Sequence, residues 1–424
     1  MTFHISKKEV LECKGWSYEN IYFFIMILYM GMANGYTQVL CFPPSKGIWT
    51  SFIPILLTII LLKRNIISFK NNTQFIKSMS IIFLWILLQT IKYSHFYAMN
   101  FFLLYNVTMA YIIAKVYKMK ILILYEKYVT SLSMLSLVVW LLYNLMPAFI
   151  SSIFNTFFIK SSGTLIANAF LVGLANSADI LGFRNTGFAQ EPGFFASYII
   201  IAMFINLLIN DYKYINRNFI ILLITLITTQ STTGYVSFSI IILLIILQSK
   251  RGKTFIVISI IILLPTIIAL PFMREKIINY SSNEESIENV IWNANYIENR
   301  GEKSVFVPQR FDGFVLESMN FLHDPILGYG VKDNHTSFVS KNLSPYISCS
   351  NGNIKIFSRF GFFLGCFFFI MLYKTGKVFD IKYKKKISLI FIIMYLTISM
   401  SYEIATIPLL LSIWGISLFT QVKQ

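Results

Sequence analysis

Residues 183–198 read FRNTGFAQEPGFFASY, a stretch that places an Arg, a Gln and a Glu at the edge of a long apolar run. Proline disfavours the α conformation in the residue before it and suits the first turn of a helix. The pair Glu191-Pro192 therefore predicts a helix that begins at Pro192. The Glu191 carboxylate then lies at the mouth of that helix, where it either caps free backbone N–H groups or takes part in chemistry.

The composition on both sides of this stretch indicates a membrane protein. Of the 424 residues, 56% are hydrophobic, 17% are aromatic and only 13% are charged, which is too apolar for an ordinary soluble domain. Apolar runs of spanning or near-spanning length lie at 20–36, 48–62, 76–92, 98–114, 128–149, 192–210, 218–231, 233–249, 254–272, 354–373, 387–401 and 405–421. We predict an all-α, polytopic integral membrane protein with about 12 transmembrane helices in a single transmembrane domain over residues 1–424.

The distribution of basic residues predicts the orientation. If the N-terminus is cytoplasmic, the inner segments hold 23 of the 36 Lys and Arg residues and only six of the 19 acidic residues. The outer segments are then neutral, with 13 basic and 13 acidic residues. The positive-inside rule thus accounts for the whole net charge of +17, so we predict no nucleic-acid partner and two cytoplasmic termini.

This orientation places two long loops on the outer face, at residues 151–191 and 273–353. Long loops on one side indicate that chemistry or recognition takes place there. In the first loop, the semi-apolar piece 164–174 suggests an interfacial helix. Between 218–231 and 233–249 the connection is so short that it predicts a tight helical hairpin with a polar tip, Thr228–Gly234.

Cysteine and histidine spacing indicates neither a metal site nor a disulfide framework. The four cysteines form no CxxC pair, and the four histidines form no HxxxH pair. The acidic group at Glu284, Glu285 and Glu288 is more typical of a solvated charge run than of a metal site. We therefore predict no metal and no cofactor.

Three short motifs carry a resemblance to a known family. They are Arg184-x-x-Gly187 leading into Glu191-Pro192-Gly193, the hairpin Ser231–Gly234, and Pro325–Gly330 followed by His335. Together with the length, helix number and two large loops, they resemble the bacterial O-antigen polymerase (Wzy) group, within the class that also contains O-antigen ligases.

The resemblance implies a function in lipopolysaccharide biosynthesis. It implies a multi-pass glycosyltransferase of the bacterial inner membrane, acting at the periplasmic face without a metal. Such a polysaccharide polymerase transfers undecaprenyl-pyrophosphate-linked glycan onto a lipid-linked oligosaccharide repeat unit. The implied partners are that lipid-linked substrate, the bilayer and a chain-length regulator protein.

Transfer from a lipid pyrophosphate needs fixed positive charge for the leaving group, and arginine binds phosphate oxygens in a bidentate manner. Arg184 and Arg310 are the candidates for binding the pyrophosphate. Each has a purely structural alternative. In that alternative, Arg184 pairs with Asp179 or with lipid headgroups, and Arg310 forms a loop salt bridge with Asp312.

The acceptor hydroxyl also needs a general base, for which Glu191 and His335 compete. A histidine titrates near neutral pH, but a lone loop histidine is more often a solvated side chain. Desolvation at the membrane edge would make Glu191 a more effective base, and the alternative is that Glu191 orients the acceptor sugar.

For sugar contacts we single out Gln230, Ser231 and Tyr329. Hydroxyl groups in membrane helices usually bond to backbone carbonyls or across helices, which is the structural alternative for the hairpin. Two further functions stay open for the whole chain. One is an O-antigen ligase, and the other is a transporter of polysaccharide or lipid-linked sugar, although the apolar runs are nearly free of the interior charges typical of transporters.

Overall fold

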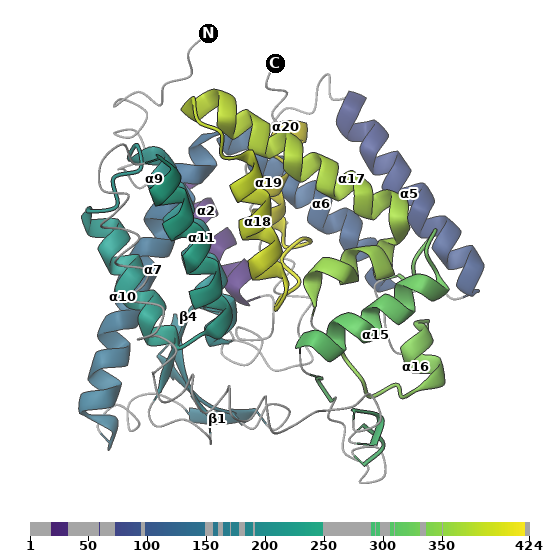
Figure 1. Cartoon of the computed structure of the whole chain (residues 1–424), viewed down its shortest axis with the longest axis horizontal. Helices are drawn as coiled ribbons and strands as arrows, with labels where there is room; N and C mark the ends of the chain where they lie inside the picture. The colour runs from purple at the N-terminus through teal and green to yellow at the C-terminus, as the bar shows by residue number, and fades with distance from the viewer. Residues whose placement is uncertain are drawn as a thin grey trace. The chain divides into compact units, whose positions relative to one another are not determined.

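The computed structural model describes residues 18–32, 59, 73–94, 98–148, 156–159, 164–169, 171–177, 183–189, 191–248, 290–292, 294–296, 306–308, 310–330, 336–349 and 351–419 (Figure 1). The chain divides into two compact units, where the sequence predicted one domain. Unit 1 comprises Met1–Thr58 and Leu122–Glu284, and unit 2 comprises Ile59–Ile121 and Glu285–Gln424.

Within the described residues, four helices are long and apolar enough to cross a membrane. They are Phe75–Tyr93, Lys120–Leu145, Pro192–Ile209 and Gly352–Tyr383. Shorter apolar helices lie at Leu103–Tyr117, Arg217–Thr229, Thr232–Leu247 and Ser388–Ser399. The fold is thus predominantly helical, as predicted, and the predicted helices 48–62, except for Ile59, and 254–272 lie outside the described residues.

Unit 1 is built around one helix. Its helices are α2 (Tyr18–Met32), α7 (Lys120–Leu145), α9 (Pro192–Ile209), α10 (Arg217–Thr229) and α11 (Thr232–Gln248). Helix α9 is apolar on all sides and buried from Pro192 to Leu208, and it packs against α10, α11 and strand β4 (Arg184–Gly187). Its start at Pro192 confirms the helix boundary that Glu191-Pro192 predicts.

The first outer loop contains a sheet instead of the predicted interfacial helix at 164–174, so that prediction is wrong. Strands β1 (Thr156–Ile159), β2 (Thr164–Ala169), β3 (Val172–Ser177) and β4 form an antiparallel sheet in the order β1-β2-β3-β4. The β2 register pairs Thr164 with Ser177 and Ala169 with Val172. A short isolated helix is marginal, and Gly173 disfavours it further, whereas in the meander each of the four strands pairs with at least one neighbour.

Unit 2 contains the remaining elements. They are α5 (Thr73–Tyr93), α6 (Ala98–Tyr117), α15 (Arg310–His323), α16 (Phe338–Asn342), α17 (Gly352–Tyr383), α18 (Ser388–Ser399), α19 (Pro408–Trp414) and α20 (Ile416–Phe419). Helix α17 packs against α15 and α18, and α19 packs against α6. Trp414, with no exposed surface, contacts the rings of Phe391 and Tyr395.

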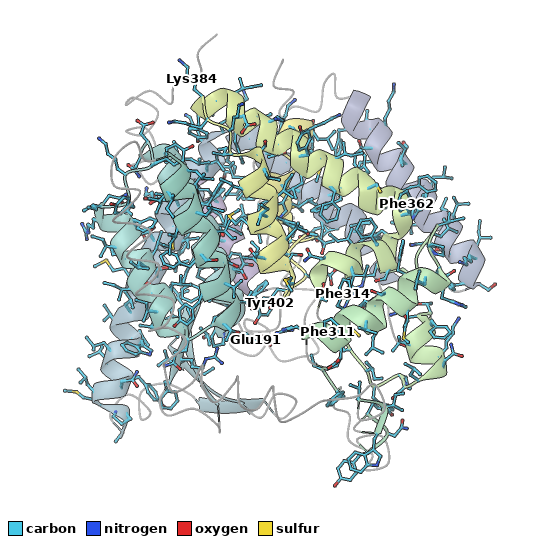
Figure 2. All side chains as sticks on the ribbon, in the orientation of Figure 1. Glu191, Phe311, Phe314, Phe362, Lys384 and Tyr402 are labelled. Atoms are coloured by element: carbon cyan, nitrogen blue, oxygen red, sulfur yellow. The ribbon has the colours of Figure 1, made fainter. Side chains whose placement is uncertain are left out.

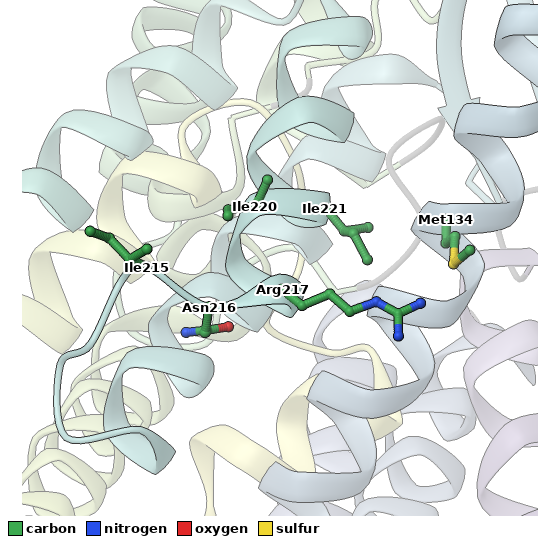
Figure 3. A pocket seen from close by; sticks show the side chains of 6 residues that line it. All are labelled: Met134, Ile215, Asn216, Arg217, Ile220 and Ile221. Carbon is green, nitrogen blue, oxygen red and sulfur yellow. The ribbon is translucent and has the colours of Figure 1, made fainter.

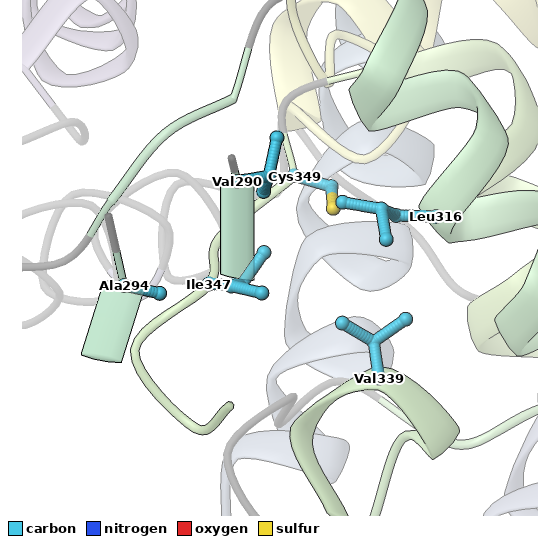
Figure 4. Packing of buried hydrophobic residues seen from close by; sticks show 6 residues of the cluster. All are labelled: Val290, Ala294, Leu316, Val339, Ile347 and Cys349. Atoms are coloured by element: carbon cyan, nitrogen blue, oxygen red, sulfur yellow. The ribbon is translucent and has the colours of Figure 1, made fainter. Parts of the chain in front are cut away.

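The second outer loop has a small hydrophobic core of its own. Figure 4 shows its six buried side chains: Val290, Ala294, Leu316, Val339, Ile347 and Cys349. Phe306 packs against this cluster and forms an isolated parallel bridge with Ile347. The described residues of this loop therefore pack together within unit 2, and this core supports helix α15.

Candidate functional site

The boundary between β4 and α9 presents Glu191 at the surface of unit 1. Glu191 is the N-cap residue of α9, with an extended backbone (φ −131°, ψ 147°), and Pro192 occupies the first helical turn. Its exposed side chain makes no capping hydrogen bond to α9 (Figure 2). The carboxylate therefore lies at the positive end of the helix dipole without being used as a backbone cap.

Arg184 binds the end of the α10–α11 hairpin. Its Nε donates to the Thr229 carbonyl at 3.2 Å, and its Nη2 donates to the Gln230 carbonyl at 3.0 Å. Gln230 adopts a left-handed conformation (φ 49°) that ends α10, so these carbonyls lie at the negative end of that helix. The guanidinium is thereby fixed in place, while Asp179, the alternative partner, lies outside the described residues.

Asn185 joins three elements, and our sequence analysis missed it. Its side-chain amide donates to Ser136 Oγ on α7 at 3.0 Å and to Thr228 Oγ1 on α10 at 3.1 Å. Its side-chain oxygen accepts from the Gly187 N–H at 2.9 Å. The signal in the sequence was a second polar residue inside the Arg-x-x-Gly motif. Asn185 has no exposed surface and holds the strand that carries Arg184.

Position 187 of the same motif requires a glycine for a steric reason. Its φ is +52°, and a Cβ at this position would lie 2.2 Å from the Phe195 ring on α9. A side chain at residue 187 would separate β4 from the first turns of α9. The Arg184-x-x-Gly187 spacing thus lets the strand approach the helix that begins after Glu191.

The hairpin hydroxyl groups bond mainly to backbone, as the structural alternative predicts. Thr228 and Thr229 donate to the carbonyls of Thr225 and Leu226, each at 2.7 Å, and Ser231 Oγ accepts from the Gly234 N–H at 3.2 Å. The Gln230 Oε1 atom differs from them. It is buried and has no hydrogen-bond partner among the described residues, so its capacity to accept a hydrogen bond is unused.

In unit 2 the polar residues gather at a break in helix α17. Gly361 has φ 74° and ψ 176°, which interrupts the helical hydrogen bonds. The carbonyls freed by the break accept bonds from the segment 325–330: Tyr329 N–H donates to Ser358 and Gly330 N–H donates to Arg359. The turn-forming sequence 325–330 therefore has a definite structural role: it donates hydrogen bonds to carbonyl groups that the break in α17 leaves free.

Two arginines lie at the segment that follows α18. Arg359 forms an ion pair with Glu403 at 2.6 Å, and the side chains are 13% and 25% exposed. The Arg310 guanidinium lies over the Tyr402 ring, 5.3 Å from its centroid. Arg310 begins α15, and partial burial raises the pKa of the nearby Asp312 carboxyl.

Tyr329 is packed inside unit 2. It is 2% exposed, and its hydroxyl donates to the Glu317 carboxylate at 3.2 Å. Glu317, itself 1% exposed, also accepts from Ser358 Oγ at 2.5 Å. Because a sugar does not reach this ring, we do not carry Tyr329 into the proposed site. The predicted base His335 lies outside the described residues.

An apolar groove lies beside the break, between α5, α6, α17 and the α19–α20 segment. It has a volume of about 100 Å³ and is lined by apolar side chains except for Ser78 and Thr406. Two of its lining residues lie close in the chain to the Arg359–Glu403 ion pair. Phe360 directly follows Arg359, and Ala405 lies two residues after Glu403. The space suits part of a hydrocarbon chain, with polar groups close to one end.

Comparison with known proteins adds no relative. No family model, curated protein or solved structure matches the chain. Within the described residues, no group of three or more His, Cys, Asp and Glu side chains could hold a metal ion.

Proposed function

We propose that the chain is a membrane glycosyltransferase that polymerises lipid-linked oligosaccharide repeat units, of the O-antigen polymerase type. The observation that carries the proposal is the fixed Arg184 guanidinium, bound to the carbonyls of Thr229 and Gln230, on the strand that leads to the exposed Glu191. This part of unit 1 combines a permanent cation, a carboxylate and the buried oxygen of Gln230.

The chemistry assigns a role to each of these groups. In the proposed reaction, an acceptor sugar hydroxyl attacks the anomeric carbon of the donor glycan, and the bond to the lipid pyrophosphate breaks. Arg184 stabilises the charge that develops on the pyrophosphate, because its guanidinium stays charged and is already oriented. Glu191 takes the proton of the hydroxyl or orients the acceptor sugar, and Gln230 holds the Arg184 guanidinium through its main-chain carbonyl.

The groove in unit 2 supports a lipid-linked substrate. A polymerase of this type needs a groove between helices for the lipid chain, and the apolar groove between α5, α6 and α17 has room for a short part of such a chain. Arg310 supplies a cation at the start of α15, whereas the charge of Arg359 is already paired with Glu403. We assign Arg310 to the phosphate groups of donor or acceptor, with His335 as the second candidate base.

The proposed location is the bacterial inner membrane, with both termini in the cytoplasm and the two long loops in the periplasm. The excess of Lys and Arg in the predicted inner segments supports this orientation. A chain-length regulator is the proposed protein partner.

The test is the lipopolysaccharide banding pattern of a strain deleted for the gene and complemented with Arg184→Lys or Glu191→Gln. We expect each variant to lower the polymerisation rate about 10²-fold or more and to leave core carrying a single repeat unit, because each removes a group used at the reacting centre. Lys118→Gln, which changes an exposed cation at the α6–α7 turn, is the control and should restore the ladder.

Protein amount and monodispersity in detergent must match wild type, since Arg184 also binds the hairpin. A normal ladder with either variant would remove that residue from the site. In the deletion strain, bare core with polymer retained on undecaprenyl pyrophosphate would instead identify a ligase, and bare core without polymer would indicate a transporter.

A further inference from the structure

A second cavity lies in unit 1, away from the hairpin tip, between α7 and the beginning of α10. It has a volume of about 540 Å³ and is lined by Met134, Ile215, Asn216, Arg217, Ile220 and Ile221 (Figure 3). Figure 3 shows the Arg217 side chain extending from α10 towards the helix that carries Met134. The cavity thus combines apolar walls with one guanidinium.

Buried hydrogen bonds hold the walls of this cavity in place. The Glu126 carboxylate on α7 accepts from Asn206 on α9 at 2.7 Å and from Asn218 on α10 at 2.9 Å. Asn216, a lining residue, donates to the Asn206 side-chain oxygen at 2.9 Å and caps α10 by accepting from the Phe219 N–H. The start of α10 is therefore fixed against α7, and the cavity is preformed.

Helix stability does not explain Arg217. It is the first residue of α10, where the helix dipole is positive and a cation is locally unfavourable. Lys213 lies four residues earlier and is exposed, and Lys127 lies on α7 two helical turns before Met134. Asp211 is an exposed acid two residues before Lys213, so the segment 211–217, with two basic residues and one acidic residue, has a net charge of +1.

We propose that this cavity binds an anionic phospholipid of the inner leaflet, with the headgroup phosphate at Arg217 and an acyl chain against Met134, Ile220 and Ile221. Two observations favour this occupant. Ile215 and Ile220 are 79% and 45% exposed, as expected for side chains that face lipid. Arg217, which lines the cavity, belongs to the segment 211–217 that the positive-inside rule assigns to the cytoplasm, where anionic lipids attract basic side chains.

The inference does not depend on the proposed reaction, so binding is measured directly. The full-length protein is placed in nanodiscs that contain phosphatidylglycerol or phosphatidylcholine with identical acyl chains, and bound lipid is counted by native mass spectrometry. We expect Arg217→Gln to weaken phosphatidylglycerol binding about fivefold, the equivalent of about 1 kcal/mol for one basic side chain, and to leave phosphatidylcholine binding unchanged. Lys118→Gln, an exposed cation with the same predicted sidedness, should change neither.

A second variant tests the apolar walls. Met134→Trp places a bulkier side chain against the acyl-chain position and should lower the binding of both lipids. Phosphatidylglycerol binding that is equal in Arg217→Gln and wild type would overturn the proposal. Wild-type lipid binding by Met134→Trp would overturn it as well, because lipid would then bind outside the cavity. Arg217 is exposed, so its variant keeps the test decisive if the tryptophan variant misfolds.

Discussion

Single residues decide whether the candidate site of unit 1 is held together. Asn185 bonds to Ser136, Thr228 and the Gly187 N–H, and each partner belongs to a different part of unit 1. A buried amide that loses such partners leaves them unsatisfied, which costs more than the bonds themselves contribute. The position of Arg184 therefore depends on a neighbour that cannot contact the substrate.

We predict that Asn185→Ala lowers the free energy of unfolding by about 1–3 kcal/mol, because it leaves a buried N–H and two hydroxyl groups without their amide partner. The measurement is the midpoint of thermal unfolding in detergent. Asn144→Ala is the matched control on α7, since Asn144 is exposed and donates only to Trp140 in its own helix. Equal midpoints for the two variants would contradict the role assigned to Asn185.

At the scale of elements, the break in α17 is the main feature of unit 2. Helix α5 stabilises it through Gln89, whose side chain is 2% exposed and donates to the carbonyls of Leu327 at 2.6 Å and Arg359 at 2.8 Å. Trp85 also donates to Leu327, at 3.3 Å. A broken helix persists only where other groups donate hydrogen bonds to its freed carbonyls, and side chains of α5 provide some of these donors.

Gln89→Leu should loosen this contact while α5 itself stays intact. The Leu327 and Arg359 carbonyls keep Trp85 and the Gly330 N–H as donors, so we expect a loss of about 1 kcal/mol. Hydrogen exchange of the Tyr329 and Gly330 amides should then accelerate about fivefold. Thr90→Val, which removes a bond within the same helix, is the control. Unchanged exchange at both amides would show that α5 does not stabilise the break.

At the scale of the whole molecule, orientation in the membrane is the central prediction, and a surface-labelling experiment checks it. Leu322 on α15 is 75% exposed and belongs to the second outer loop, whereas Lys384 ends α17 on the predicted inner side. In intact spheroplasts, a membrane-impermeant maleimide should label Leu322→Cys at least tenfold more than Lys384→Cys. After membrane disruption both should react, and equal labelling before disruption would contradict the orientation. The parent chain with its native cysteines gives the background.

Much of the helical fold follows from the sequence because its signals are local. The apolar runs predicted α5, α6, α9, α10 and α11 to within a few residues, whereas α7 begins at Lys120, eight residues before the predicted run 128–149. Glu191-Pro192 predicted where α9 begins. The polar tip predicted the tight turn between α10 and α11, which the structure confirms through the left-handed Gln230. These features depend on neighbouring residues, proline geometry and the length of a hydrophobic run.

The site depends on contacts between distant residues, which sequence patterns do not specify. Arg184 binds carbonyls more than forty residues away, and Tyr329, predicted for sugar contact, is directed to Glu317 by the packing of α15 and α17. The meander at 156–187 replaced a predicted helix because strand pairing satisfied its backbone. The sequence by itself determined the apolar helices and the charge bias. Only the tertiary structure decided which buried polar groups meet, because each must find a partner within hydrogen-bond distance once the helices have packed.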